Sequence, residues 1–89
     1  MTYTEAIERA LSGDESGFNF LYNATKTDKY YLALKYVKDR ETAEDVLQEA
    51  YLKAWKKLDT VEPEKFEAWF AQIVANTAKN VLEKKKHTA

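Results

Sequence analysis

Apolar residues recur at helical spacing through most of this chain, and the most regular stretch runs from residue 40 to residue 58. One face of that stretch carries apolar side chains at intervals of three and four residues, namely Ala43, Leu47, Ala50, Tyr51, Ala54 and Leu58. Because an α-helix turns every 3.6 residues, this spacing predicts one amphipathic helix of about five turns. Its apolar face must be buried against other parts of the chain.

The other face of this predicted helix is acidic in its first half. It carries Glu44, Asp45, Gln48 and Glu49, with Leu52 beside them. Carboxylates in the first turns of a helix oppose its macrodipole and stabilise it, so they need no binding partner to account for them. The periodicity alone therefore leaves open whether this face contacts another molecule.

Two shorter helical patterns precede this stretch. Thr2 and Glu5 have the spacing of a capping box, which predicts a first helix that begins there and ends before Gly13 in a left-handed cap. Asp14 is placed to cap a second helix, whose apolar stripe begins at Phe18. The polar run of residues 23–28 predicts a kink or a short break, with a restart at Thr27 or Asp28.

After that run, residues 30–37 are apolar on most sides, which predicts a central position in the fold. Residues 58–65 contain Pro63 and are predicted to be irregular, with the proline opening the last helix. The apolar stripe of that helix is formed by Phe66, Trp69, Phe70, Ile73, Val74, Thr77 and Val81. Trp69 is therefore expected in the core. The predicted fold class is all-α, a compact bundle of three long helices plus a short N-terminal helix.

The composition excludes most catalytic and metal chemistry. The chain of 89 residues has the length of one domain, spanning 1–89, and it contains no cysteine. Its single histidine, His87, is close to the end, so neither a Ser-His-Asp triad nor a histidine metal cluster can form. The sequence has no glycine-rich phosphate loop, and we expect neither a membrane span nor a signal peptide. We expect a cytoplasmic binding module without a cofactor or metal, and not an enzyme.

Charge is unevenly distributed along the chain. Acidic residues outnumber basic ones in residues 1–63, and basic residues outnumber acidic ones in residues 64–89, which include Lys84, Lys85 and Lys86. A basic end can attract a polyanion such as nucleic acid. Lysines are also common at helix ends, where they oppose the macrodipole, so the charge pattern alone leaves both interpretations open.

Three motifs together resemble conserved region 2 of bacterial sigma factors of the extracytoplasmic-function group. Residues 39–55, DRETAEDVLQEAYLKAW, are similar to the signature D-R-x-x-A-E-D-x-x-Q-E-x-F-x-x-A-W. Upstream, Gly13, Asp14 and Glu15 with Phe18 match the opening of that region. Downstream, residues 66–80 are similar to its F-x-x-W-L and I-A-x-N-x-A-x-N run. The three motifs occur in the family's order and span nearly the whole chain.

The resemblance implies that the predicted middle helix binds RNA polymerase core. In the family, the acidic face of that helix docks on the clamp coiled coil of the largest subunit. The matching residues here are Asp45, Gln48, Glu49 and Leu52. Carboxylates beside an apolar contact suit a partner helix that carries arginines, and charge complementarity sets the register and the association rate.

The resemblance also implies that the last helix and the loop before it recognise or melt the minus-ten promoter element. The partner would be promoter DNA, mainly the non-template strand. The matching residues are Lys65, Trp69, Gln72, Asn76, Lys79 and Asn80, followed by Lys84, Lys85 and Lys86 for backbone phosphates. Aromatic and amide side chains can stack on or bond to unpaired bases, and lysines attract phosphates.

The sequence departs from the family pattern in the part that would bind DNA. Ala71, Gln72 and Ala75 occupy positions where arginines are usual, and Glu62 and Glu64 make the loop acidic. An alternative is therefore a sigma-like module that binds polymerase or an anti-sigma factor without reading DNA. The family's second DNA-binding domain would lie beyond residue 89, so we expect this domain to be the N-terminal part of a longer chain, and the alternative is a standalone variant.

Overall fold

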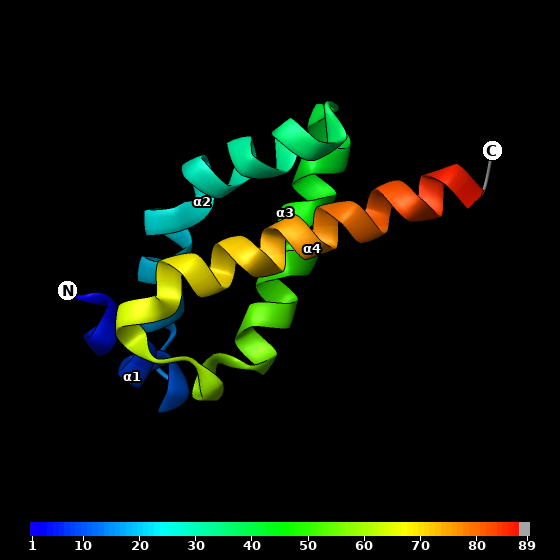
Figure 1. The fold of residues 1–89 in the computed structure, drawn as a ribbon. Coiled ribbons are helices and arrows are strands. Elements are labelled where there is room, and N and C mark those ends of the chain that lie inside the picture. Colours follow the sequence, from blue (N-terminus) through cyan, green and yellow to red (C-terminus); the bar gives the residue numbers. More distant parts are fainter. Residues whose placement is uncertain (88–89) are drawn as a thin grey trace.

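Residues 1–87 fold into four α-helices and two short 3-10 turns. The computed structural model describes the backbone of residues 1–87 and the side chains of residues 1–84. The α-helices are α1 (Tyr3–Leu11), α2 (Glu15–Val37), α3 (Arg40–Lys56) and α4 (Phe66–His87), and the 3-10 turns are η1 (Leu58–Thr60) and η2 (Pro63–Lys65) (Figure 1). The described residues contain no strand. The predicted all-α architecture of one short and three long helices is confirmed.

The helix starts follow the predicted capping residues. The Thr2 hydroxyl accepts a hydrogen bond from the Glu5 backbone N–H at 3.1 Å, and the Asp14 carboxylate accepts one from the Ser16 N–H at 2.9 Å. Gly13 has a φ of +92°, in the left-handed region that favours glycine. These contacts could be predicted from the sequence because each one joins residues that lie within one helical turn of each other.

The second helix does not restart within residues 23–28 as predicted, because α2 is continuous from Glu15 to Val37. The buried Thr25 hydroxyl bonds to the Leu21 backbone oxygen at 2.7 Å and shares a hydrogen bond of 2.5 Å with the Tyr51 hydroxyl. The Thr25 hydroxyl thus has hydrogen-bond partners in α2 and α3, so it does not compete for the backbone hydrogen bonds of the helix. Burial raises the pKa of Tyr51 above its ordinary value.

The second half of α2 is not central, which contradicts the expectation from its apolar circumference. Tyr31 is 59% exposed, and Leu32, Leu34, Tyr36 and Val37 are only partly buried. Only α3 and α4 are available to cover this half, because α1 packs against the first half, where Gly17 approaches Ala6 and Ala10. The aromatic rings that remain uncovered lie beside the start of α3.

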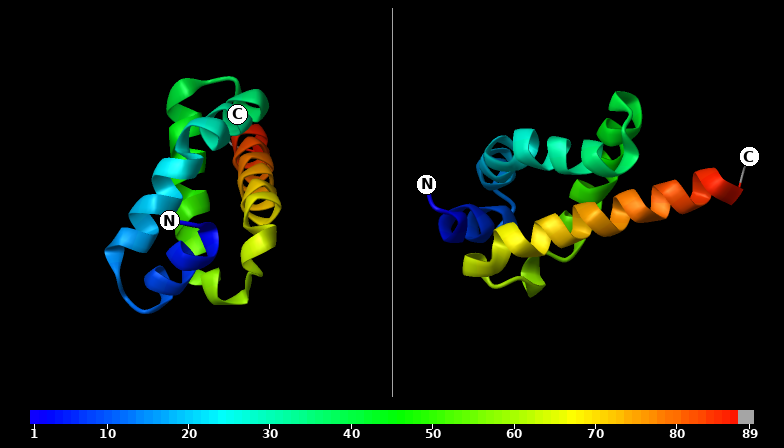
Figure 2. Two further views of the ribbon diagram at one scale, coloured as in Figure 1. Left: turned by 90° about the vertical axis from the view of Figure 1, so that its left-hand side faces the viewer. Right: turned by 45° about the horizontal axis from the view of Figure 1, so that its top comes forward.

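The connection between α3 and α4 is short and ordered. The middle helix ends at Lys56, two residues before the predicted end, and the buried Leu58 begins η1. Pro63 opens η2, which leads directly into α4 at Phe66. α1 packs against both 3-10 turns, as the two views in Figure 2 show. The loop that precedes α4 is thus held by the N-terminal helix.

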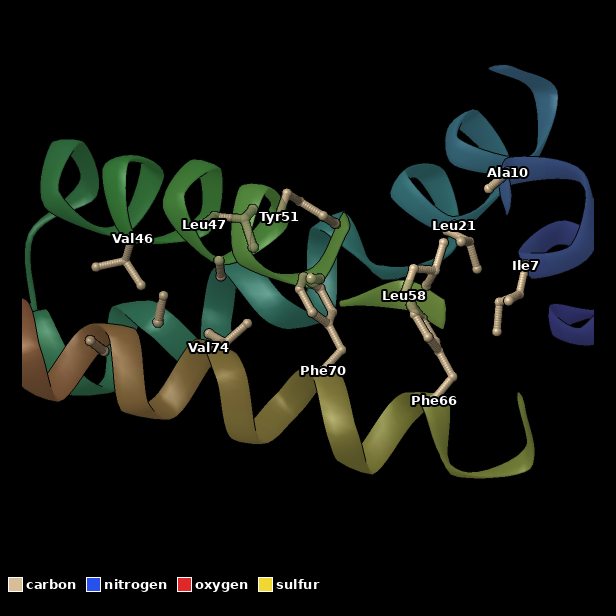
Figure 3. Close-up of a cluster of buried hydrophobic side chains, with 14 of the residues drawn as sticks. Ile7, Ala10, Leu21, Val46, Leu47, Tyr51, Leu58, Phe66, Phe70 and Val74 are labelled. Atoms are coloured by element: carbon tan, nitrogen blue, oxygen red, sulfur yellow. The ribbon is translucent and has the colours of Figure 1, made fainter. Parts of the chain in front are cut away.

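The core is organised along α4. Phe66, Phe70 and Val74 are fully buried and project from this helix toward α2 and α3 (Figure 3). The Phe70 ring lies 4.8 Å from the Tyr51 ring, centroid to centroid. Helix α4 contacts both α2 and α3, so these three side chains join the three long helices.

A buried lysine ties α2 to the first turn of α4. Lys29 is 8% exposed, and its Nζ lies 2.7 Å from Glu67 Oε2. The Tyr3 hydroxyl donates a hydrogen bond to the other oxygen of Glu67. Burial and this carboxylate raise the pKa of Tyr3 to about 12. Burial raises the pKa of Glu67, but the hydrogen bonds from Lys29 and Tyr3 and the Lys29 charge outweigh it, so the net pKa is lowered.

Replacing Glu67→Gln is expected to lower the free energy of unfolding by about 1–2 kcal/mol at pH 7. This is less than for a fully buried pair, because the Glu67 side chain is 49% exposed. A lowered folded-state pKa stabilises the fold above the unfolded pKa of about 4.3, and this contribution is lost as pH falls through the folded pKa. Urea unfolding at neutral and acidic pH measures it.

The difference between Glu67→Gln and the wild type should therefore shrink with falling pH. The exposed neighbour Glu64, changed to glutamine, is the matched control and should match the wild type at every pH. A constant difference between Glu67→Gln and the wild type, or none at pH 7, would contradict the role assigned to this carboxylate.

Candidate functional site

The first candidate surface is the acidic strip on α3, which we define as Asp45, Gln48, Glu49 and Leu52. Helical spacing places these residues on one side of α3, and Val46, Leu47 and Ala50 on the other side, in the core. Asp45 and Gln48 are exposed, Glu49 is partly exposed and Leu52 is 63% exposed. The fold therefore leaves the acidic strip accessible to solvent.

No internal contact occupies the polar groups of the acidic strip. Within the part of the chain that the structure describes, the side chains of Asp45, Gln48 and Glu49 form no hydrogen bond or ion pair. Asp39 caps α3 and Glu41 lies in its first turn, where a carboxylate opposes the macrodipole. Asp45 and Glu49 lie beyond that turn, where this effect has largely faded, so helix stability alone does not account for them.

The neighbouring surface of α2 was not predicted from the sequence. Two hollows adjoin Gln48 in the groove between α2 and α3. One contains Tyr22, Tyr30, Tyr31 and Glu44, and the other contains Phe18, Leu52 and Trp55. Exposed aromatic and apolar side chains grouped in this way mark binding surfaces. The aromatic excess on residues 30–37 was the available signal, but the same apolar pattern also predicts burial.

The second candidate surface begins at the loop before α4. A hollow there is lined by Thr60, Val61, Glu62, Lys65, Ala68 and Trp69. Lys65 forms an exposed ion pair with Glu62 at 3.2 Å. Trp69 was expected in the core but is only partly buried. Its ring lies 6.0 Å from the Phe66 ring, centroid to centroid, and the residue also lines the hollow.

Polar side chains continue this surface along α4. The polar row, which we define as Trp69, Gln72, Asn76 and Asn80, repeats every three to four residues and so shares one side of the helix. The Gln72 amide donates to Asn76 Oδ1 at 3.0 Å.

Lysines flank the polar row. Lys79 Nζ lies 5.9 Å from the centre of the Tyr36 ring, and Lys84 is exposed. The side chains of Lys85 and Lys86, also predicted to bind phosphate, lie outside the described residues.

Two further kinds of site are absent from the described residues. Among the side chains of residues 1–84, no group of three His, Cys, Asp or Glu residues is arranged to hold a metal ion. No helix in the same range combines the length and the apolar character that crossing a lipid bilayer requires.

Comparisons with known proteins agree on one family. The family model for sigma-70 region 2 matches residues 21–88. The ECF RNA polymerase sigma-E factor of Haemophilus influenzae is 34% identical over 92% of this chain and 43% of its own length. The RNA polymerase sigma factor SigV of Bacillus subtilis is 42% identical over 68% of this chain and 37% of its own length. The chain thus spans less than half the length of these relatives.

A solved structure shares the whole architecture. An engineered region 2 of sigmaE, determined by NMR in complex with GTAAAA, superposes with a TM-score of 0.88 at 34% identity, covering 99% of this chain and 93% of that one. The order of the sequence motifs, the family model and this superposition agree. The chain therefore belongs to the sigma-70 region 2 family, in the form found in extracytoplasmic-function sigma factors.

Proposed function

We propose that this chain is a transcription initiation domain that docks on RNA polymerase through α3 and recognises or melts the minus-ten promoter element through α4 and the loop before it. One observation carries the proposal. The acidic strip is exposed and its polar groups have no partner among the described residues. The occupant proposed for it is the clamp coiled coil of the largest polymerase subunit.

The chemistry of the acidic strip suits such a partner. Asp45 and Glu49 can accept paired hydrogen bonds from arginine guanidinium groups, which are stronger than neutral hydrogen bonds. Leu52 supplies an exposed apolar contact at the end of the strip, one turn after Gln48, and the hollow beside Gln48 adds the partly exposed Tyr22 ring. Aromatic residues and arginines are enriched where protein interfaces gain most of their affinity.

The chemistry of the second surface suits unpaired bases. Trp69 offers part of an aromatic face beside a hollow, and the amides of the polar row can both donate and accept hydrogen bonds. The engineered region 2 of sigmaE, which shares this fold, was solved in complex with GTAAAA. Promoter DNA is therefore the partner that we propose for α4.

Charge reversal on the acidic strip tests the docking proposal. The double variant Asp45→Lys with Glu49→Lys is expected to weaken binding to a clamp coiled-coil fragment on the order of 100-fold, because like charges would then face its arginines. Glu8→Lys with Glu64→Lys makes the same change in net charge at exposed sites away from the strip and should bind as the wild type does. Isothermal titration calorimetry measures both affinities, and equal affinities would overturn the proposal.

A second candidate function is a polymerase-binding or anti-sigma-binding module that does not read DNA. It is favoured by Glu62 and Glu64 in the loop, since Glu62 partly neutralises Lys65. Binding of a single-stranded oligonucleotide that contains GTAAAA separates the two. Promoter reading predicts affinity that falls when Trp69→Ala is introduced and that exceeds the affinity for a scrambled sequence. Equal affinity for both sequences would favour the second candidate.

A further inference from the structure

Side chains from three different helices meet at the first turn of α4. Lys29 of α2 places its Nζ 2.7 Å from Glu67 Oε2, and the Tyr3 hydroxyl of α1 donates a hydrogen bond to Glu67 Oε1. We define Tyr3, Lys29 and Glu67 as the Glu67 network. Because both oxygens of one carboxylate are occupied, α1 and α2 together fix the orientation of the turn in which α4 begins.

Stability alone does not account for the Glu67 network. Lys29 is only 8% exposed, and removing an ammonium group from water has a desolvation cost that can exceed its attraction to a carboxylate. Apolar residues of similar volume at both positions of a buried ion pair often give an equally stable or more stable protein. What the ion pair adds over such residues is direction, since its hydrogen bonds fix how the two helices lie relative to each other.

The Glu67 network adjoins the hollow at the loop before α4. The Tyr3 ring lies 5.1 Å from the Phe66 ring, and the Phe66 ring lies 6.0 Å from the ring of Trp69, which lines the hollow. Helix α1 also packs against η1 and η2, and each of these turns contributes residues to the hollow (Figure 1). Displacing α1 would therefore change how the loop and Trp69 lie relative to each other.

The Glu67 network does not itself line the hollow. None of its three residues is among those that form the walls. Glu67 and Trp69 are two residues apart in α4, so their side chains project about 200° apart around the helix axis. Any effect of the network on a base in the hollow must therefore act through the orientation of α4 and the loop.

We propose that Tyr3, Lys29 and Glu67 are positioning residues for promoter reading, which hold the hollow beside Trp69 in the arrangement that accepts an unpaired base. This inference rests on the proposed function of α4. A binding surface that is ordered before its ligand arrives loses less conformational freedom on binding, so it binds more tightly. Helix α1 thereby contributes to DNA reading through the loop that it supports.

The main test removes both charges of the Glu67 network together. Lys29→Met with Glu67→Leu should keep a thermal midpoint within about 5 °C of the wild type. Its affinity for the GTAAAA oligonucleotide, measured by fluorescence anisotropy, should fall about 10-fold, as expected if only about a tenth of the molecules keep the binding arrangement. Lys35→Met with Glu8→Leu makes the same exchange at exposed positions and should bind as the wild type does.

Three further readouts separate positioning from direct contact and from loss of the fold. The salt dependence of oligonucleotide binding should be unchanged in the double variant, because no phosphate contact is removed. Binding of the clamp fragment should be unchanged, and the NMR signal of the Trp69 indole N–H should shift in the free protein.

A second variant tests the same network with a smaller change. Tyr3→Phe keeps the ring against Phe66 and removes only the hydroxyl, so it should lower the affinity for the oligonucleotide about 3-fold. The exposed Tyr31, changed to phenylalanine, is its control and should have no effect. If the double variant does not fold, Tyr3→Phe decides by the same readouts.

Wild-type affinity for the oligonucleotide in the variants of the Glu67 network would overturn this inference and leave the function of α4 standing. A weaker salt dependence would mean that Lys29 contacts phosphate directly, which contradicts a positioning role. Equal losses of clamp binding and DNA binding would show that the network supports only the fold, and would also exclude that role. Failure of the wild type to bind the oligonucleotide would overturn both this inference and the proposed function of α4.

Discussion

Replacing Phe70→Ala is expected to lower the free energy of unfolding by about 3–5 kcal/mol. Phe70 is fully buried, and its ring packs 4.8 Å from Tyr51 and 5.9 Å from Phe66, so truncation leaves a cavity where the three long helices meet. A domain of this size has a total stability of about 4–13 kcal/mol, so the variant should lose a large fraction of its stability. Urea unfolding followed by circular dichroism measures the change.

The exposed Tyr31 provides the matched control for Phe70. Its side chain is 59% exposed, so Tyr31→Ala should change the free energy of unfolding by about 0.5 kcal/mol or less. If the two alanine variants were equally stable, α4 would not be the centre of the core, and the positions assigned to its polar row and to the loop before it would lose their support.

Gly17→Ala is expected to destabilise the domain by about 3 kcal/mol, although alanine normally favours a helix over glycine by about 1 kcal/mol. A Cβ at Gly17 would lie 2.5 Å from the Ala10 backbone nitrogen and closer still to the Ala6 backbone oxygen. Backbone atoms cannot rotate away as a side chain can, so α1 would have to move off α2. Urea unfolding and amide hydrogen exchange in α1 measure the effect.

The control for Gly17 is Asn19→Ala, an exposed position two residues further along α2. It should leave stability within about 0.5 kcal/mol of the wild type or raise it slightly. A stabilising effect of Gly17→Ala, equal to that at residue 19, would show that α1 does not make the close approach to α2 on which the placement of the loop depends.

Local features of this fold could be predicted from the sequence because their causes are local. The caps at Thr2, Gly13 and Asp14 each involve atoms within one turn, and all three are present as predicted. The continuity of α2 could not be predicted, since Thr25 is satisfied in part by Tyr51, which is 26 residues away in sequence. The Lys29 to Glu67 pair was missed for the same reason.

The candidate site also has features that could be predicted from the sequence and features that could not. The exposure of Asp45 and Gln48 followed from the period of one helix, and the structure confirms that exposure while their roles stay proposals. The hydrogen bond from Lys53 to Thr77 could not be predicted, because it requires α3 and α4 to be placed against each other. Tyr31 belongs to a segment that was predicted to be central, but its side chain is exposed. A helix that is apolar on most sides is buried only when enough neighbouring elements exist to cover it.

The central claim is that α3 and α4 present two separate surfaces that are occupied at the same time. Titration of the isotope-labelled chain with the clamp coiled-coil fragment, with the GTAAAA oligonucleotide and then with both, followed by amide NMR shifts, tests it directly. We expect the fragment to shift residues 44–52, the oligonucleotide to shift residues 60–80, and both to stay bound together. Shifts of the acidic strip by the oligonucleotide, or displacement of one ligand by the other, would contradict it.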